Sequence, residues 1–135
     1  MKYLIAPVKL LATALLLLAT VLSANTQNIR VACVGNSVTF GYKIDQREEN
    51  CYHAQLQELL GDQYPVENFG KSEATLLRNG HRPYMQQEEF KKSVAFYPDI
   101  LIVSLGLNDI DPRNWPNYRD EFISDYMAFK FPVKI

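Results

Sequence analysis

The segment ILIVSL, residues 100–105, constrains the fold of this chain more than any other part of the sequence. It is almost continuously apolar, whereas a strand with one face in water alternates apolar and polar residues. The segment therefore predicts a strand that is covered on both faces. Such strands belong to parallel sheets that have helices on either side.

The rest of the chain alternates between strand and helix signals. Short runs at 29–34 and 66–69 predict two further strands. Apolar residues at helical spacing predict helices over residues 52–60, 83–97 and 118–127. The resulting order βαβαβα predicts an α/β fold with an open, doubly wound parallel sheet.

The N-terminus, residues 1–24, is predicted to be a secretory signal peptide. A positive charge at Lys2 precedes an apolar stretch that ends in small residues. This stretch has 15 residues between Lys9 and Asn25, fewer than the roughly 18 to 20 that cross a bilayer. We therefore expect residues 25–135 to form the domain of a secreted or periplasmic protein with no membrane span after signal cleavage.

The composition fits one globular domain, with 47% hydrophobic and 21% charged residues in a chain of 135. Signal cleavage removes two of the 14 basic residues, so 12 remain against 15 acidic ones and the net charge becomes −3. Because no basic stripe remains, nucleic acid is not an expected partner.

The two cysteines, Cys33 and Cys51, allow two interpretations. An exported protein can join them in a disulfide. Cys33 also lies inside an apolar strand, where a free thiol behaves as a small hydrophobe. No cysteine or histidine spacing matches a metal site, so we expect neither a metal nor another cofactor.

Three small polar turns follow the three predicted strands. They are Gly35–Thr39, Gly70–Ser72 and Gly106–Asp109. Chemistry in open α/β sheets lies beyond the carboxyl ends of the strands, so these turns are expected to converge on one edge.

The residues in these turns are of the types that ester hydrolysis needs. That reaction requires a hydroxyl nucleophile and hydrogen-bond donors for the oxyanion that forms on attack. Ser37 can supply the hydroxyl. Its own N–H, the N–H of Gly70 and the side-chain amide of Asn108 can supply the donors. Taken alone, Ser37 also suits a simple helix or turn cap.

The three turns resemble the three motif blocks of the SGNH (GDSL-like) hydrolases. The serine turn Gly35–Thr39, the glycine in Asn68–Gly70 and the G-x-N-D segment Gly106–Asp109 correspond in order. The resemblance extends over about residues 29–128. It implies a flavodoxin-like SGNH hydrolase fold and a serine esterase activity, with Ser37 as nucleophile and an oxyanion hole completed by Gly70 and Asn108.

Two further segments, 79–84 and 111–116, make the resemblance closest to secreted bacterial members similar to sialate O-acetylesterases. This implies a glycan or small-molecule acetyl ester as substrate. A lipase or aryl-esterase activity of the same family is the alternative.

The late Asp-x-x-His block, which supplies the base and its orienting acid in this family, is absent from the sequence. We therefore expect the chain to be the N-terminal part of a longer family sequence, lacking the last strands and helix. Weak or absent hydrolysis is the expected consequence, and a non-catalytic sugar-binding remnant is the alternative. The two histidines, His53 and His81, are the remaining candidate bases. The edge strand left exposed by the missing strands predicts self-association.

Candidate substrate-binding residues lie in the loops of the same edge. Arginine can grip the carboxylate of an acidic sugar through two hydrogen bonds, which favours Arg82 and Arg113. His81 is placed with them, and Trp115 either floors a sugar pocket or anchors its loop. Arg78 is interpreted as a solvated loop charge.

Overall fold

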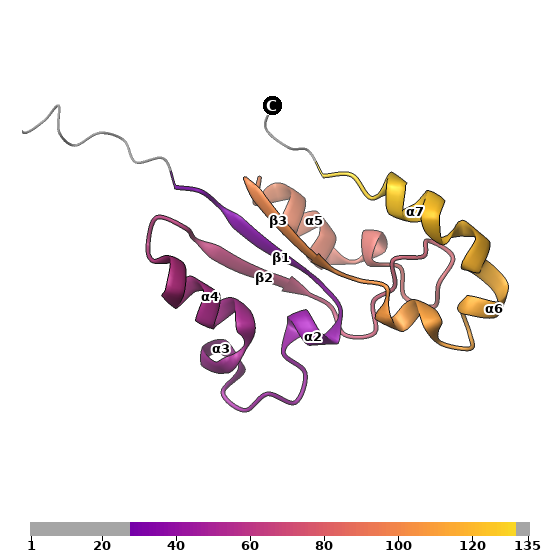
Figure 1. Cartoon of the computed structure of the whole chain (residues 1–135), viewed down its shortest axis with the longest axis horizontal. Coiled ribbons are helices and arrows are strands. Elements are labelled where there is room, and N and C mark those ends of the chain that lie inside the picture. Colours follow the sequence, from indigo (N-terminus) through magenta and orange to yellow (C-terminus); the bar gives the residue numbers. More distant parts are fainter. Residues whose placement is uncertain (1–27, 132–135) are drawn as a thin grey trace, which may run out of the picture.

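The computed structural model describes residues 28–131, so the predicted signal peptide lies outside the described residues. Three parallel strands, β1 (Val31–Gly35), β2 (Val66–Gly70) and β3 (Ile100–Ser104), form a sheet in the order β2-β1-β3. Helices lie on both faces of this sheet (Figure 1). This arrangement confirms the predicted α/β fold class.

Short helical segments connect and flank the strands. The α-helices are α2 (Ser37–Phe40), α3 (Arg47–Asn50), α4 (Tyr52–Leu60), α5 (Glu88–Ala95), α6 (Trp115–Tyr118) and α7 (Phe122–Ala128). The 3-10 turns are η1 (Tyr84–Gln86), η2 (Leu107–Ile110) and η3 (Arg119–Glu121). The predicted helix at 52–60 is confirmed, and Gly61 ends it with a left-handed φ of 77°. The helix predicted from Pro83 is divided into η1 and α5.

The central strand β1 separates two apolar clusters. Ala32 and Val34 face the cluster under α5, together with Phe69 and Tyr84. The side chains of Val31 and Cys33 point to the opposite face, where they pack against a cluster that includes Leu56 of α4. This alternation follows from the period of two along a strand, and it buries every residue of β1.

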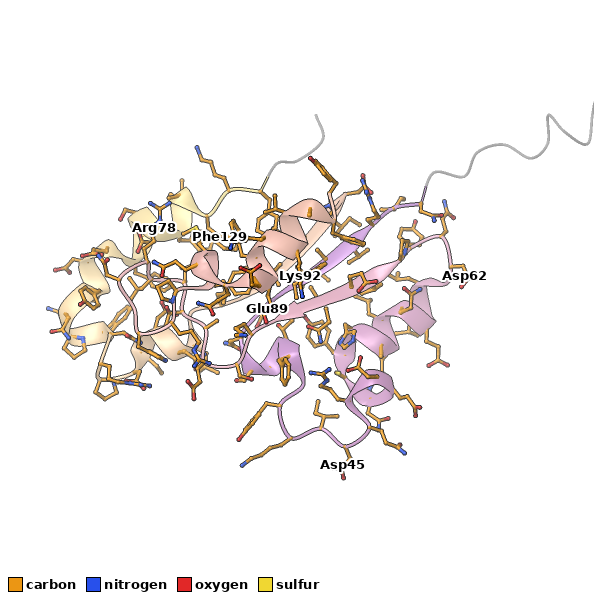
Figure 2. The ribbon with its side chains drawn as sticks, turned by 180° about the vertical axis from the view of Figure 1, so that it is seen from behind. Asp45, Asp62, Arg78, Glu89, Lys92 and Phe129 are labelled. Atoms are coloured by element: carbon orange, nitrogen blue, oxygen red, sulfur yellow. The ribbon has the colours of Figure 1, made fainter. Side chains whose placement is uncertain are left out.

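Aromatic side chains close the cluster under α5. Phe129, just after α7, lies against Phe90 of α5 at a ring-centroid distance of 6.0 Å and against Tyr84 at 6.2 Å (Figure 2). The hydroxyl of Tyr84 donates to the carbonyl of Phe69 at 2.6 Å, so this buried ring has its polar atom satisfied. The chain after β3 is thereby packed on to the same face as α5.

The strand β3 is less covered than its apolar run alone predicts, and in the described part of the chain it lies at the edge of the sheet, as expected for a chain without the later strands. Ile100 is 44% exposed and Val103 is 41% exposed, although the sequence predicted cover on both faces. The reason is its position, because within residues 28–131 β3 pairs only with β1 and lies at the edge of the sheet. The strand that is buried on both faces is β1.

We expect residues 25–135, produced alone, to self-associate through β3. An edge strand offers unpaired backbone groups to a second copy, and β3 has no charged residue to prevent this. Val103→Lys should therefore move the protein towards the monomer in sedimentation velocity at rising concentration. Leu59→Lys, at an exposed apolar position on α4, is the matched control and should leave association unchanged. A wild-type protein that stays monomeric would contradict the prediction.

Both cysteines are buried free thiols, so the disulfide interpretation is wrong for this structure. Burial raises the pKa of the Cys33 thiol, which keeps it protonated in its apolar surroundings. Among residues 28–131, no group of histidine, cysteine and carboxylate side chains is arranged to hold a metal ion. The same residues contain no helix of the length and hydropathy needed to cross a membrane.

Candidate active site

Ser37 begins α2 directly after β1. The preceding Asn36 is buried, and its Oδ1 accepts the N–H of Val38 at 3.0 Å, which caps the helix. The N–H of Asn36 donates to the carbonyl of Ser104 at 3.1 Å. The serine turn is therefore tied to the end of β3, the strand that leads to Asn108.

Gly35 allows this turn to fold tightly over the strand end. A Cβ at position 35 would lie 2.1 Å from Oγ1 of Thr39 and 2.7 Å from the carbonyl oxygen of Ser104. Thr39 is fully buried, and its Oγ1 accepts the Tyr52 hydroxyl at 3.3 Å. Gly35, two positions before Ser37, is thus required by packing.

Ser37 and Asn108 line one small pocket of about 190 Å³. Its other lining residues are Tyr42, Ser72 and Glu73. The pocket lies beyond the carboxyl ends of the strands. It lies next to the end of the central strand β1, which has β2 on one side and β3 on the other. The structure therefore brings residues of all three predicted turns together, namely Ser37, Ser72 and Asn108, although 71 positions separate the first from the last.

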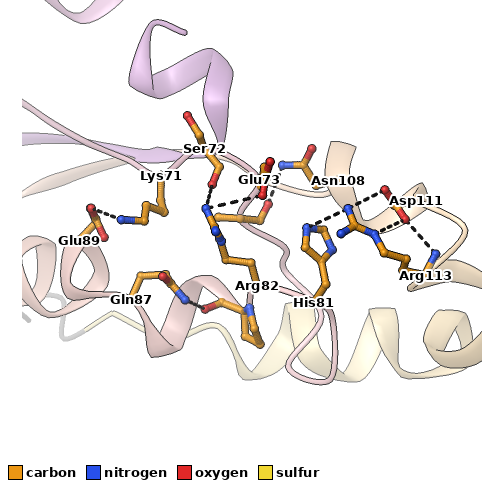
Figure 3. A network of polar contacts seen from close by, with 12 residues as sticks. Lys71, Ser72, Glu73, His81, Arg82, Gln87, Glu89, Asn108, Asp111 and Arg113 are labelled. Carbon is orange, nitrogen blue, oxygen red and sulfur yellow. Dashed lines mark hydrogen bonds and ion pairs between the residues drawn. The ribbon is translucent and has the colours of Figure 1, made fainter.

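Asn108 is held in this pocket by its own side chain. Its Nδ2 donates to the carbonyl of Ala74 at 2.9 Å, which uses one of its two N–H groups. No acceptor for the other N–H is present among residues 28–131. Ala74 belongs to the loop that also places Ser72 and Glu73, so the second and third turns are joined at the pocket (Figure 3).

Gly70 is not among the residues that line this pocket. Its N–H already donates to Oδ1 of Asn68 at 2.8 Å. A Cβ at position 70 would lie 2.1 Å from the backbone nitrogen of Phe40. The glycine is therefore needed because α2 approaches the end of β2 closely.

Tyr42 and Glu73 are the pocket residues that the sequence did not indicate, and the backbone of Glu73 is unusual. Glu73 adopts a left-handed backbone conformation with a φ of 64°, which is uncommon for a residue other than glycine. No acceptor for its backbone N–H is present among the described residues. The Oγ of Ser72 is buried beside it and also has no hydrogen-bond partner there. The sequence could not have predicted this backbone conformation at Glu73, because a left-handed conformation is normally predicted only where glycine is present.

We expect Gly70→Ala to destabilise the protein by about 3 kcal/mol, because the added methyl group meets backbone that cannot rotate away. Urea unfolding measures the change. Gly61→Ala is the comparison, since its Cβ would meet no atom within 4 Å. That variant has only the strain of a backbone conformation that favours glycine, with φ 77° and ψ −178°, about 1 to 3 kcal/mol. A loss below about 1 kcal/mol for Gly70→Ala would refute the packing explanation of Gly70.

Neither histidine lies in the pocket. His81 lies between two residues of the loop after β3. Nδ1 of His81 is 2.9 Å from Nδ2 of Asn114, and Nε2 of His81 is 3.4 Å from Nη2 of Arg113. His53 is buried on α4, with its Nδ1 3.2 Å from Nδ2 of Asn68. His53 instead lines a separate hollow of about 690 Å³ along α4. Among residues 28–131, no histidine is in place to take the proton of Ser37.

The two arginines predicted to bind substrate each face a carboxylate of the chain. Arg113 binds Asp111 through two hydrogen bonds of 2.9 and 3.0 Å, and these bonds lower the pKa of Asp111 to about 2. Arg82 lies 3.6 Å from Glu73 and donates to the carbonyl of Ser72 at 3.2 Å (Figure 3). Arg82 is thus next to the pocket lining, whereas Arg113 is next to His81.

Arg78 and Trp115 also have partners within the chain. The backbone N–H of Arg78 donates to Asp125 at 2.9 Å, and its guanidinium lies 3.8 Å from the same carboxylate. Trp115 packs edge-on against Phe122 at a centroid distance of 5.8 Å and is not among the pocket residues. This contact favours the interpretation that Trp115 anchors its loop.

A serine hydroxyl and a carboxamide that face one pocket, beyond the ends of parallel strands, make this a site of the serine-hydrolase type. Residues 33–128 match the sequence profile of the GDSL-like Lipase/Acylhydrolase family, and the chain belongs to that family.

Known proteins similar to this chain include an acetylxylan esterase of Xylanibacter ruminicola. It is 50% identical over 97 residues, which are 72% of this chain and 20% of the relative. The chain thus spans about a fifth of the length of that protein. The crystal structure of AlinE4, an SGNH-hydrolase family esterase, is 21% identical and covers 78% of this chain and 57% of its own, with a TM-score of 0.49.

Proposed function

We propose that this chain belongs to a secreted or periplasmic serine esterase that removes acetyl groups from carbohydrate. The observation that carries the proposal is the shared pocket of Ser37 and Asn108. The family match supports ester hydrolysis as the reaction. The apolar stretch at the N-terminus supports export.

In the proposed reaction, the Oγ of Ser37 attacks the ester carbonyl, and the bond from that carbonyl carbon to the sugar oxygen breaks. The sugar leaves as an alcohol with the proton lost by Ser37, and an acetyl-serine remains. Water then attacks the acetyl-serine, which releases acetate and restores the serine hydroxyl. Three donors surround the oxyanion. They are the free N–H of the Asn108 side chain, the N–H of Ser37 at the start of α2, and the N–H of Glu73 in place of that of Gly70.

The substrate is proposed to be an acetyl ester of an uncharged sugar. A pocket of about 190 Å³ has room for a small acyl group, and the similar protein from Xylanibacter ruminicola is an acetylxylan esterase. A sialate ester is the finer substrate that the sequence suggested. The ion pairs of Arg82 and Arg113 with carboxylates of the chain favour the uncharged sugar, because those guanidinium charges are already compensated.

Hydrolysis by this chain alone is proposed to be slow. Within residues 28–131 no histidine lines the pocket of Ser37, and a serine without such a base is a poor nucleophile. The same observation favours a second candidate function, a sugar-binding domain that retains the pocket without turnover.

Trapping of the acetyl-serine tests the proposal. The chain is mixed with an aryl acetate, quenched in acid and digested, and the peptide that contains Ser37 should gain the mass of one acetyl group. The peptide that contains Ser124, an exposed serine on α7, is the internal control. Acetylation of neither peptide, with binding of xylo-oligosaccharide retained, would support the sugar-binding function instead.

Substrate preference is measured by release of acetate. We expect acetylated xylo-oligosaccharide to be hydrolysed faster than O-acetylated sialic acid. Asp111→Asn removes the carboxylate that compensates Arg113, so it should raise the relative rate on the sialic acid ester. A faster rate on sialic acid in the unaltered protein would reverse the proposed preference.

A further inference from the structure

Asp109 is a fully buried carboxylate directly beside the pocket residue Asn108. Its Oδ2 accepts the backbone N–H of Leu76 at 3.0 Å, and its Oδ1 accepts that of Leu77 at 2.6 Å. Both donors belong to the loop after β2, 32 and 33 positions earlier in the chain. Hydrogen bonds from N–H groups to a carboxylate are about twice as strong as those between neutral groups.

These two bonds continue the contact that Asn108 begins. Asn108 donates to the carbonyl of Ala74, so two consecutive side chains of η2 bind the segment from Ala74 to Leu77. Glu73, which lines the pocket, immediately precedes that segment. The position of the Glu73 peptide relative to the Asn108 amide is therefore set by three hydrogen bonds from η2.

Asn114 supports the same arrangement from the other side. It is fully buried, its Nδ2 donates to the backbone carbonyl of Asn108 at 2.9 Å, and its Oδ1 accepts the N–H of His81 at 2.9 Å. The loop after β2 is thus joined to the loop after β3 at both of its ends. Asn114 thus holds the loop at His81, whereas Asp109, together with Asn108, holds the half of the loop nearest the pocket.

We propose that Asp109 is a positioning residue, which keeps the side-chain amide of Asn108 and the backbone N–H of Glu73 aligned on a common oxyanion. Asp109 does not touch the substrate; it acts through the loop. A carboxylate is required, because an amide at this position would direct N–H against N–H at one of the two backbone donors. The proposal rests on the proposed esterase function for its kinetic consequence, but the alignment itself is measurable without turnover.

The kinetic test compares Asp109→Asn with Asp125→Asn. Asp125 is also buried, and it also accepts a backbone N–H of the same loop, that of Arg78, away from the pocket. We expect Asp109→Asn to lower kcat on an aryl acetate on the order of 10²-fold with little change in KM, as misplaced groups do. Asp125→Asn should lose stability with kcat retained. Equal kcat for Asp109→Asn and wild type would overturn the proposal.

A second test uses the wild-type protein and needs no activity. In hydrogen-exchange NMR, the Nδ2 proton of Asn108 and the backbone protons of Leu76 and Leu77 should exchange slowly and at similar rates. Exchange of the Asn108 proton at the rate of a free side-chain amide would overturn the proposal, even where Asp109→Asn does not fold. Loss of the acetyl-serine with protection of all three protons would instead count against the proposed function alone.

Discussion

Ser37→Ala is expected to reduce the hydrolysis of an aryl acetate to the rate of buffer alone, so that the whole of the slow rate that exceeds buffer in the unaltered chain is lost. The reason is that the attacking atom is removed while the donors of the pocket remain. A fluorogenic acetate gives the sensitivity that a slow reaction requires. The variant should unfold at the same urea concentration as wild type, because the Ser37 hydroxyl makes no hydrogen bond within residues 28–131.

Ser124→Ala is the matched control for this experiment. Ser124 is an exposed serine on α7 whose Oγ donates only to the carbonyl of Glu121, so its loss should leave the rate unchanged. Equal rates for Ser37→Ala and wild type, both above buffer, would remove Ser37 from the mechanism and assign the hydrolysis to another group.

The sequence was sufficient to predict that Ser37 and Asn108 meet. Three apolar runs separated by helical spacing predict parallel strands, and parallel strands place the turns after them at one edge of the sheet. The prediction needed no knowledge of individual contacts. The geometry of the strand ends alone brings the two residues to one pocket.

The donor from the second turn could not be predicted in the same way. Gly70 was predicted to be the donor because a glycine lets its backbone approach a ligand. In the structure its lack of a Cβ lets Phe40 approach closely, and its N–H donates to Asn68. The pocket residues from this part of the chain are Ser72, which belongs to the predicted turn, and Glu73. The left-handed backbone of Glu73 is imposed by the surrounding loop, and propensity gives no indication of such a tertiary effect.

The carboxylates that pair with the two arginines could not be predicted from the sequence either. Arg82 and Arg113 were interpreted as ligands of an acidic substrate because they lie in loops of the active edge. Their pairing with Glu73 and Asp111 depends on how those loops fold. The exposure of β3 differs from these cases, because β3 was expected to be an edge strand, although an apolar run alone specifies a strand without its place in the sheet.

Asn108→Ala is expected to lower the rate of Ser37-dependent hydrolysis by about 10²- to 10³-fold, the typical effect of removing one oxyanion donor. The loss should fall on kcat, because the oxyanion exists only after attack and the amide contributes little to binding of the ground state. Michaelis profiles on an aryl acetate separate the two constants. The acetyl-serine measured by mass spectrometry should also form more slowly in proportion.

Stability must be measured on the same variant, because the Asn108 side chain also donates to the carbonyl of Ala74. Loss of that bond is expected to cost about 1 kcal/mol. Asn79→Ala is the matched control, since it removes an exposed amide that donates to Glu121 at 2.8 Å in the loop after β2. If Asn108→Ala raised KM and left kcat unchanged, Asn108 would be a residue that binds the substrate, and the oxyanion would be stabilised by the backbone N–H groups of Ser37 and Glu73 alone.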